Sequence, residues 1–118
     1  MTSTLDRSEF KNSALYAPDL IINEAISCLS RLHRNQIISN SLYQYSIEDL
    51  TLIPKNIISS RTLINSIPAK LGNISAYDAA YVCLAESLKI PLYTTDEKLS
   101  KSAQKYCEVK LIQRKDNL

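Results

Sequence analysis

Glycine and histidine are scarce in this chain, and their scarcity excludes several classes of enzyme. Gly72 is the one glycine among 118 residues, so the sequence cannot form the glycine-rich turns that wrap a backbone around a pyrophosphate or triphosphate. His33 is the one histidine. It falls in a predicted helix with no paired motif near it, which argues against Ser-His-Asp and Cys-His catalysis. The chemistry that remains for an enzyme of this composition is that of carboxylates.

The sequence also lacks the features of a membrane, secreted or disulfide-bonded protein. No apolar run approaches the roughly 18 residues of a membrane span, and the polar start MTSTLDRSEFKNS has no signal-peptide core. Cys28, Cys83 and Cys107 are odd in number and show no CxxC spacing, which predicts buried, reduced thiols instead of a disulfide or zinc site. We therefore expect a cytoplasmic protein. Its net charge of +2 is compatible with nucleic-acid binding without arguing for it.

The length and the hydrophobic pattern predict one α/β domain over residues 1–118. Strands are predicted at 13–17, 51–54, 91–94 and 109–112, and helices at about 18–34, 40–50, 56–67, 76–88 and 96–105. Pro18 suits the first turn of its helix, because its missing N–H would be unpaired there anyway. The segment 76–88 is apolar almost all round, which is typical of a helix buried on several sides. The alternation of elements predicts a parallel sheet with helices on both of its faces.

Three acidic residues stand near the predicted starts of helices. Glu24 lies at the margin of an apolar helix face, where we expect a boundary position, and Asp78 and Asp96 lie in the first turns of two later helices. In an open α/β sheet these helix starts share the carboxyl edge of the strands. Three carboxylates packed together repel one another unless a divalent cation compensates. The pattern predicts a Mg²⁺ or Mn²⁺ site, in which a metal-bound water can attack a phosphodiester.

A second interpretation of the two aspartates needs no metal. Ser75 and Asp78 resemble a capping box with Asp in place of Glu, and Asp96 is a candidate N-cap after Thr94 and Thr95. Each such cap is common and stabilises a helix by about 1 kcal/mol. Helix capping and metal binding therefore both stay open at this point.

Two segments of the chain resemble the PIN domain family. SAYDAAYVCLAESLKIPLYTTDEKLSKSA is similar to the third and fourth acidic motifs of these domains, especially in VapC toxins of type II toxin–antitoxin pairs, where a Y-D-A-x-Y helix precedes an apolar strand ending in T-x-D. YAPDLIINEAISCLSRLHRNQIIS is similar to the second motif, a P-x-L turn followed by a glutamate and a leucine-rich helix. Together the two segments cover roughly residues 14–113.

The resemblance implies a PIN-like three-layer α/β/α fold with a short, mostly parallel sheet, and a Mg²⁺- or Mn²⁺-dependent endoribonuclease. Glu24, Asp78 and Asp96 match the acidic positions of the family, and Thr94 would support the turn that carries Asp96. RNA is then the substrate and an antitoxin protein a partner. Cations that bind phosphate should border such a site, and the candidates are Arg31, Arg61, Lys98 and Lys101.

The chain departs from the family at its beginning. PIN domains open with a hydrophobic strand that carries the first aspartate, and here only Asp6 stands at a comparable place. Residues 7–13 would join Asp6 to the next strand, whereas a parallel crossover needs about a dozen residues or more. We therefore expect an N-terminally truncated PIN-like domain, with residues 1–12 as a poorly ordered arm. The gap in the sheet would be filled by closure of the sheet, by a non-parallel N-terminal segment, or by a strand from a second copy or another protein.

Three functions are consistent with these observations. The first is a VapC-like ribonuclease, with reduced activity if its site has three acids. The second is a catalytically degenerate PIN-like module that keeps dimerisation or antitoxin binding without hydrolysis. The third is an unrelated α/β binding domain in which the acids are helix caps only.

Overall fold

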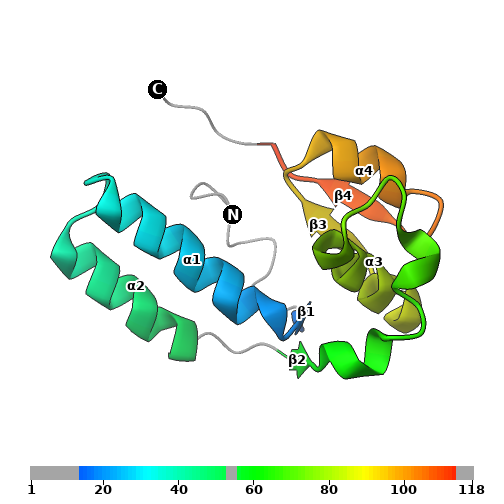
Figure 1. Cartoon of the computed structure of the whole chain (residues 1–118), viewed down its shortest axis with the longest axis horizontal. Coiled ribbons are helices and arrows are strands. Elements are labelled where there is room, and N and C mark those ends of the chain that lie inside the picture. Colours follow the sequence, from blue (N-terminus) through cyan, green and yellow to red (C-terminus); the bar gives the residue numbers. More distant parts are fainter. Residues whose placement is uncertain (1–13, 53–55, 114–118) are drawn as a thin grey trace.

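The computed structural model describes residues 14–52 and 56–113, in which short strands alternate with helices (Figure 1). The elements are β1 (Tyr16–Pro18), α1 (Leu20–Arg34), α2 (Asn40–Leu52), β2 (Asn56–Ile58), the 3-10 turns Ser60–Leu63 and Pro68–Lys70, α3 (Ala76–Leu88), β3 (Leu92–Thr94), α4 (Glu97–Ala103) and β4 (Val109–Leu111). The predicted α/β class is confirmed. Within these ranges no helix combines the length and the apolar character needed to cross a membrane. The predicted arm at 1–12 and the role considered for Asp6 lie outside the described residues.

All strand pairing in the described part of the chain is parallel, as predicted. β1 pairs with β2, with Ala17 opposite Ile57, and β3 pairs with β4, with Leu92 opposite Val109. One short sheet was predicted, whereas the described strands form two separate two-stranded pairs. Each strand has three residues, so ladder hydrogen bonds are few and helix packing holds each pair in place. α3 contacts both β1 and β3, and α4 contacts both β3 and β4.

The strand predicted at 51–54 is wrong where the structure describes it. Thr51 and Leu52 form the end of α2, and the Thr51 hydroxyl donates to the carbonyl of Glu48 at 2.7 Å. Residues 53–54 lie outside the described residues. Before α1, Pro18 is the last residue of β1 instead of part of the first helical turn. Helix ends shift by a residue or two in this way because capping and strand pairing compete for them.

The helix predicted at 56–67 is also wrong. Its first residues form strand β2, because the β-branched side chains of Ile57 and Ile58 favour an extended backbone that pairs with β1. The hydroxyl-rich residues that follow bond to nearby backbone groups and form the short 3-10 turn Ser60–Leu63 instead of an α-helix. Ser59, for example, accepts a hydrogen bond from the backbone N–H of Arg61 at 3.2 Å.

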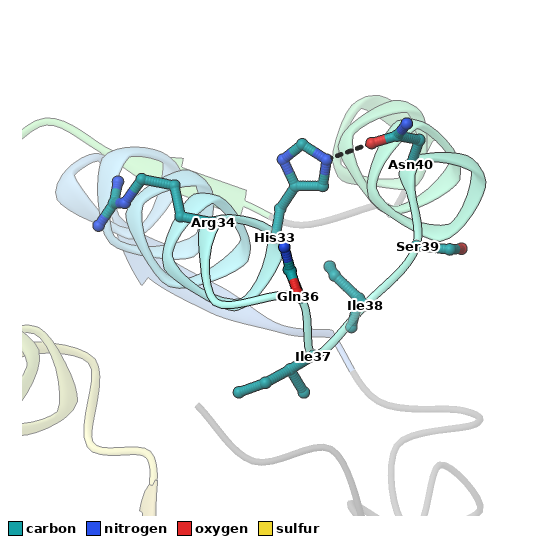
Figure 2. Close-up of a pocket in the computed structure, with 7 residues that line it drawn as sticks. All are labelled: His33, Arg34, Gln36, Ile37, Ile38, Ser39 and Asn40. Carbon is teal, nitrogen blue, oxygen red and sulfur yellow. Dashed lines mark hydrogen bonds between the residues drawn. The ribbon is translucent and has the colours of Figure 1, made fainter.

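α1 and α2 form a hairpin that lies to one side of α3 and α4 (Figure 1). Near its turn the ring of His33 stacks on Tyr43 with centroids 4.5 Å apart and bonds to the side chain of Asn40 (Figure 2). The Tyr43 hydroxyl is also 2.9 Å from Ser30 Oγ. The single histidine is therefore a structural residue that joins the two helices. An open hollow beside it is lined by His33, Arg34, Gln36, Ile37, Ile38, Ser39 and Asn40.

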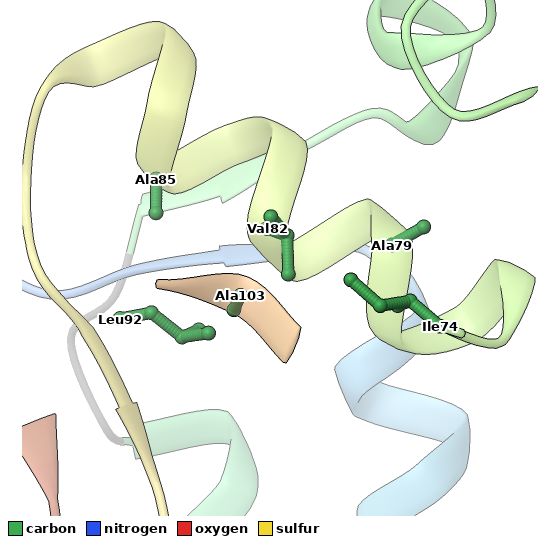
Figure 3. Packing of buried hydrophobic residues seen from close by; sticks show 6 residues of the cluster. All are labelled: Ile74, Ala79, Val82, Ala85, Leu92 and Ala103. Atoms are coloured by element: carbon green, nitrogen blue, oxygen red, sulfur yellow. The ribbon is translucent and has the colours of Figure 1, made fainter. Parts of the chain in front are cut away.

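α3 is the central helix of the core, as its apolar sequence predicted. One face contributes Ala79, Val82 and Ala85 to a buried cluster with residues of β3 and α4 (Figure 3). The opposite side contributes Ala80, Cys83 and Leu84 to a second cluster around Leu63. Alanine at three of these positions lets neighbouring elements approach the helix closely. Because α3 is packed on two sides, the core fixes the position of the helix.

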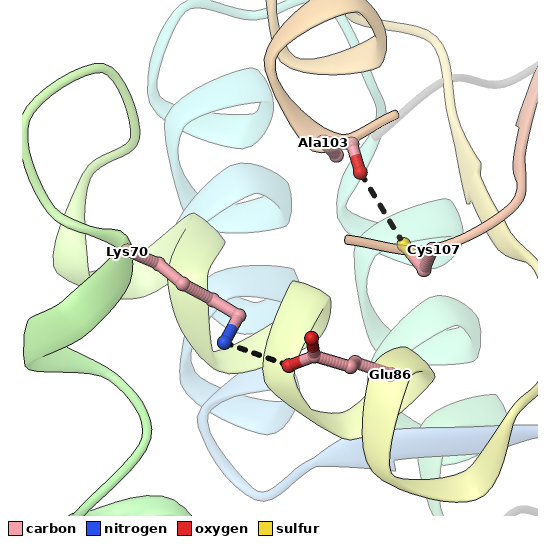
Figure 4. Close-up of polar contacts among 4 residues, drawn as sticks. All are labelled: Lys70, Glu86, Ala103 and Cys107. Atoms are coloured by element: carbon pink, nitrogen blue, oxygen red, sulfur yellow. Dashed lines mark hydrogen bonds and ion pairs between the residues drawn. The ribbon is translucent and has the colours of Figure 1, made fainter. Parts of the chain in front are cut away.

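The three cysteines are free thiols, as predicted. The predicted burial is confirmed for Cys83 in α3, whereas Cys28 and Cys107 are only half-buried. Burial raises the pKa of the Cys83 and Cys107 thiols above the usual cysteine value. The Cys107 thiol donates to the carbonyl of Ala103 at 3.8 Å (Figure 4). The raised pKa keeps the Cys83 and Cys107 thiols in the unreactive, protonated form.

Lys70 connects the 3-10 turn Pro68–Lys70 to α3 through an ion pair with Glu86. Its side chain is only 7% exposed, and its Nζ lies 2.7 Å from Glu86 Oε1 (Figure 4). The same ammonium lies 4.8 Å from the centre of the Tyr106 ring. The hydrogen bond to Glu86 outweighs burial and raises the pKa of Lys70. A buried cation is thus compensated by one carboxylate and one aromatic face.

Removing the carboxylate is expected to destabilise the protein more than removing the cation. Glu86→Ala should lower the free energy of unfolding by about 1–3 kcal/mol, because it leaves a nearly buried ammonium without its partner. Lys70→Met keeps the apolar stem without the charge and should cost less. Urea denaturation at pH 7 measures both. Equal losses would contradict the importance of the ion pair.

The pair also predicts the direction of a pH dependence. The pKa of Lys70 is raised in the folded state above 10.5, so its contribution is fully present below that pH and is lost as the pH rises through the folded-state pKa. Wild type should therefore lose stability faster than Lys70→Met above this pH in thermal unfolding. Parallel curves for the two proteins would argue against the linkage.

Candidate functional site

The candidate site lies where the first turns of α1 and α3 come together. Leu20, at the start of α1, packs against the buried cluster that includes Leu84 of α3. Glu24 is four residues later and therefore lies on the same face of α1. Asp78 and Tyr81, three residues apart, likewise share one face of α3. The two faces meet where Tyr81 Oη donates a hydrogen bond to Glu24 Oε1 at 2.6 Å.

The Tyr81 hydroxyl stays protonated in this position. Burial is the main cause that raises its pKa well above the usual tyrosine value, followed by the hydrogen bond to Glu24 and the negative charges of Glu24 and Asp78. The 2.6 Å separation is typical of a hydroxyl that donates to an ionised carboxylate. The charges of Glu24 and Asp78 therefore both help to keep the Tyr81 phenol neutral.

Glu24 is more exposed than the sequence predicted. We expected a boundary position at the margin of the apolar face, and the residue is exposed. The physical reason is that α1 packs chiefly against α2, so the margin that carries Glu24 meets α3 only near its first turns. The hydrogen bond from Tyr81 marks that contact.

Asp78 takes part in the capping of α3 through its backbone N–H and not through its carboxylate. Ser75 is the N-cap of α3, and its hydroxyl accepts from the backbone N–H of Asp78 at 3.1 Å. The half-buried Asp78 carboxylate has no hydrogen-bond or ion-pair partner among the residues that the structure describes. Ser75 thus does the capping, and the Asp78 carboxylate takes no part in it.

Asp96 caps a helix with one of its oxygens. It is the N-cap of α4, where its Oδ1 accepts from the backbone N–H groups of Lys98 at 2.9 Å and Leu99 at 3.1 Å. Its own backbone N–H donates to the Thr94 hydroxyl at 3.1 Å. The turn between β3 and α4 is thereby held by Thr94 and Asp96 together. Capping uses only Oδ1 and leaves Oδ2 as a second acceptor.

Asp96 follows a strand that packs against α3. Leu92 of β3 and Ala85 of α3 belong to one buried cluster (Figure 3), and Asp96 lies in the turn after β3. Within residues 14–52 and 56–113, however, no three His, Cys, Asp or Glu side chains are grouped closely enough to hold a metal ion.

Comparison of the sequence with known proteins identifies the family of the chain. Over 107 residues the chain is 33% identical to ribonuclease VapC1 of Mycobacterium tuberculosis, which covers 90% of the chain and 80% of the relative. Over 100 residues it is 30% identical to ribonuclease VapC9 of the same species, with 85% and 79% covered. The chain belongs to the VapC ribonuclease family. Ribonuclease VapC3 is 27% identical over 96 residues, 81% of the chain and 70% of the relative. No protein-family model matches the chain, and no solved structure matches it significantly.

The resemblance of this VapC family member to PIN domains is thereby confirmed, as is its α/β fold with short parallel strands. The predicted N-terminal truncation concerns residues outside those described, and it stays a prediction. The assignment of Glu24, Asp78 and Asp96 to one metal site also stays a prediction. The structure joins Glu24 to Tyr81 by a hydrogen bond, with Asp78 on the same face of α3 as Tyr81, and it places Asp96 on the turn after β3.

The basic residues predicted to flank the site are all exposed, at different distances from the acids. Arg61 follows Ser60, whose hydroxyl donates to Asp19 Oδ1 at 2.7 Å just before α1. Lys98 and Lys101 lie in α4, whose first turn Asp96 caps. Arg31 lies in the last turn of α1, about 10 Å along the helix axis from Glu24. Their role in binding RNA stays a prediction.

Sequence reasoning missed Tyr81 as a residue of this VapC site. The quoted Y-D-A-x-Y pattern contains it, and its spacing from Asp78 already places both side chains on one face of a helix. What the sequence does not contain is its hydrogen-bond partner, because Glu24 lies 57 residues earlier in the chain.

Proposed function

We propose that this chain is a metal-dependent endoribonuclease of the VapC type, which hydrolyses RNA phosphodiester bonds with Glu24, Asp78 and Asp96 as its catalytic acids. The observation that carries the proposal is the hydrogen bond that joins Glu24 of α1 to Tyr81 of α3, on the helix face that also carries Asp78, in a chain whose relatives are ribonucleases. These acids come from elements far apart in sequence, which a set of independent helix caps would not require. The proposed setting is the cytoplasm, where RNA substrates are found.

The oxygen donors of the site suit Mg²⁺ or Mn²⁺. Both are hard cations that bind a few carboxylate oxygens and keep several waters. Glu24 and Asp78 would hold the ion, with Asp96 Oδ2 as a third donor from the turn after β3. When bound, the metal supplies an activated water as the nucleophile. With few protein ligands described, the expected affinity is low, and reduced activity is part of the proposal.

The residues of the chain position the acids and the RNA in this proposal. Ser75 fixes the first turn of α3, and Thr94 fixes the turn that carries Asp96. The exposed cations Arg61 and Lys98 supply positive charge for the phosphate backbone, which strengthens RNA binding at low salt. The acids then act from rigid elements, while the RNA is held by flexible surface side chains.

A second candidate function is that of an interaction module that binds an antitoxin or a second copy of the chain without hydrolysis. The observation that favours it is the absence of a three-ligand group in the described ranges. The α1–α2 hairpin also exposes apolar side chains, among them Ile22 at 46% and Ile26 at 38%. Such residues are suited to contact with another protein.

RNA cleavage with and without metal tests the proposed function. The purified chain should cleave fluorescent single-stranded RNA in Mn²⁺ or Mg²⁺ and lose this activity in EDTA. Asp78→Asn keeps the shape of the side chain without its charge and should lower cleavage by about 100-fold or more. The matched control is Asp49→Asn, which removes an exposed aspartate of α2 away from the site and should leave cleavage unchanged.

Two outcomes would contradict the proposal. Cleavage that persists in EDTA would exclude the metal mechanism. If the folded chain neither binds Mn²⁺ in calorimetry nor cleaves RNA, the interaction module is the function that remains.

A further inference from the structure

Among the described residues, the bond from Tyr81 to Glu24 is the one side-chain hydrogen bond between α1 and α3. α1 otherwise packs chiefly against α2, and only Ala25 along its length is buried. The Glu24 side chain is therefore not held by surrounding atoms in the way that a core residue is. Among the described residues, the hydroxyl of Tyr81 is the hydrogen-bond partner that restricts its direction.

The negative charge of Asp78 makes the hydrogen bond from Tyr81 important for the orientation of the Glu24 carboxylate. Asp78, one turn before Tyr81 on the same face of α3, acts on the same phenol as Glu24. Two carboxylates near one group repel each other, and an exposed glutamate can relieve the repulsion by rotating into solvent. A hydroxyl that donates at 2.6 Å from a half-buried ring opposes that rotation.

We propose that Tyr81 is a positioning residue, whose hydroxyl holds the Glu24 carboxylate beside Asp78. This inference rests on the proposed function for its catalytic consequence, since a metal site requires both carboxylates on one side. It goes beyond the three acids by assigning a role to a side chain that does not itself bind the metal. The ring of Tyr81 fixes the place of the hydroxyl, and the hydroxyl fixes the carboxylate.

The kinetic test removes only the hydroxyl. Tyr81→Phe keeps the packed ring, and it should weaken Mn²⁺ binding in calorimetry and lower kcat for RNA cleavage by about 10- to 100-fold each. KM for RNA should change by less than about twofold, because the phenol does not contact the substrate. Tyr77→Phe is the matched control. Tyr77 is 68% exposed on the same helix, and loss of its hydroxyl should change neither quantity.

A double-mutant cycle tests the contact without any need for activity. In urea unfolding, Tyr81→Phe and Glu24→Ala should each raise the unfolding equilibrium constant about three- to tenfold. Because both remove the same bond, the double variant should lose little more than either single variant.

The outcomes separate this inference from the proposed function. Additive effects in the unfolding cycle, or equal Mn²⁺ affinities of wild type and Tyr81→Phe where the metal binds, would overturn the positioning role. Coupled effects in a chain that does not cleave RNA would overturn the ribonuclease proposal and support the placement of Glu24 by Tyr81. Coupled effects together with weaker metal binding and lower kcat would support both.

Discussion

Asp96→Asn is expected to lower RNA cleavage by about 100-fold or more while the stability of the protein stays the same. Asparagine caps helices as well as aspartate does, so the hydrogen bonds to Lys98 N–H and Leu99 N–H are kept. The amide nevertheless lacks the negative charge that binds a cation. The substitution therefore separates the two interpretations of Asp96 that the sequence left open. Cleavage assays and urea denaturation on the same preparation measure both effects.

Asp96→Ala is the companion variant, because it removes the cap together with the charge. It should lose the same cleavage activity and also about 1 kcal/mol of unfolding free energy. If Asp96→Asn cleaves RNA at the wild-type rate, Asp96 is a helix cap and nothing more. If the two variants lose the same stability, the capping hydrogen bonds contribute nothing measurable.

Val82→Asp is expected to destabilise the protein by more than about 4 kcal/mol. Val82 has no exposed surface and lies in the cluster that joins α3 to β3 and α4 (Figure 3). The carboxylate would be buried without a partner, since the neighbouring side chains of the cluster are apolar. A small domain has about 5–15 kcal/mol of stability in total, so the variant should be largely unfolded in circular dichroism at room temperature.

The matched control places the same residue type on the surface of the same helix. Tyr77 is 68% exposed in the first turn of α3, where a negative charge is favourable because of the helix dipole. Tyr77→Asp should therefore change the stability by no more than about 0.5 kcal/mol. A folded Val82→Asp protein, with a urea midpoint near that of the control, would contradict the central place of α3 in the core.

α1 and α3 were predictable from the placement of their apolar residues. In α1 these residues form one face, and in α3 they occur almost all round, which is typical of a helix buried on several sides. β3, α4 and β4 were predictable because two short apolar runs are separated by a polar segment that begins with a capping residue. The secondary structure of residues 51–67 was mispredicted because the conformation of such short segments depends on the elements that pack against them. β2 becomes a strand when β1 is beside it, and hydroxyl side chains then hold the turns after it.

The acids themselves were visible in the sequence, and so was the family that the comparisons confirm, because both depend on residue types at local spacings. The division of the strands into two parallel pairs was not visible, since pairing between three-residue strands is decided by the helix that packs on them. The link between Glu24 and Tyr81 likewise joins residues 57 positions apart. A hydrogen bond over that separation exists only after α1 and α3 have packed, so the tertiary structure alone decided that these two side chains share a site.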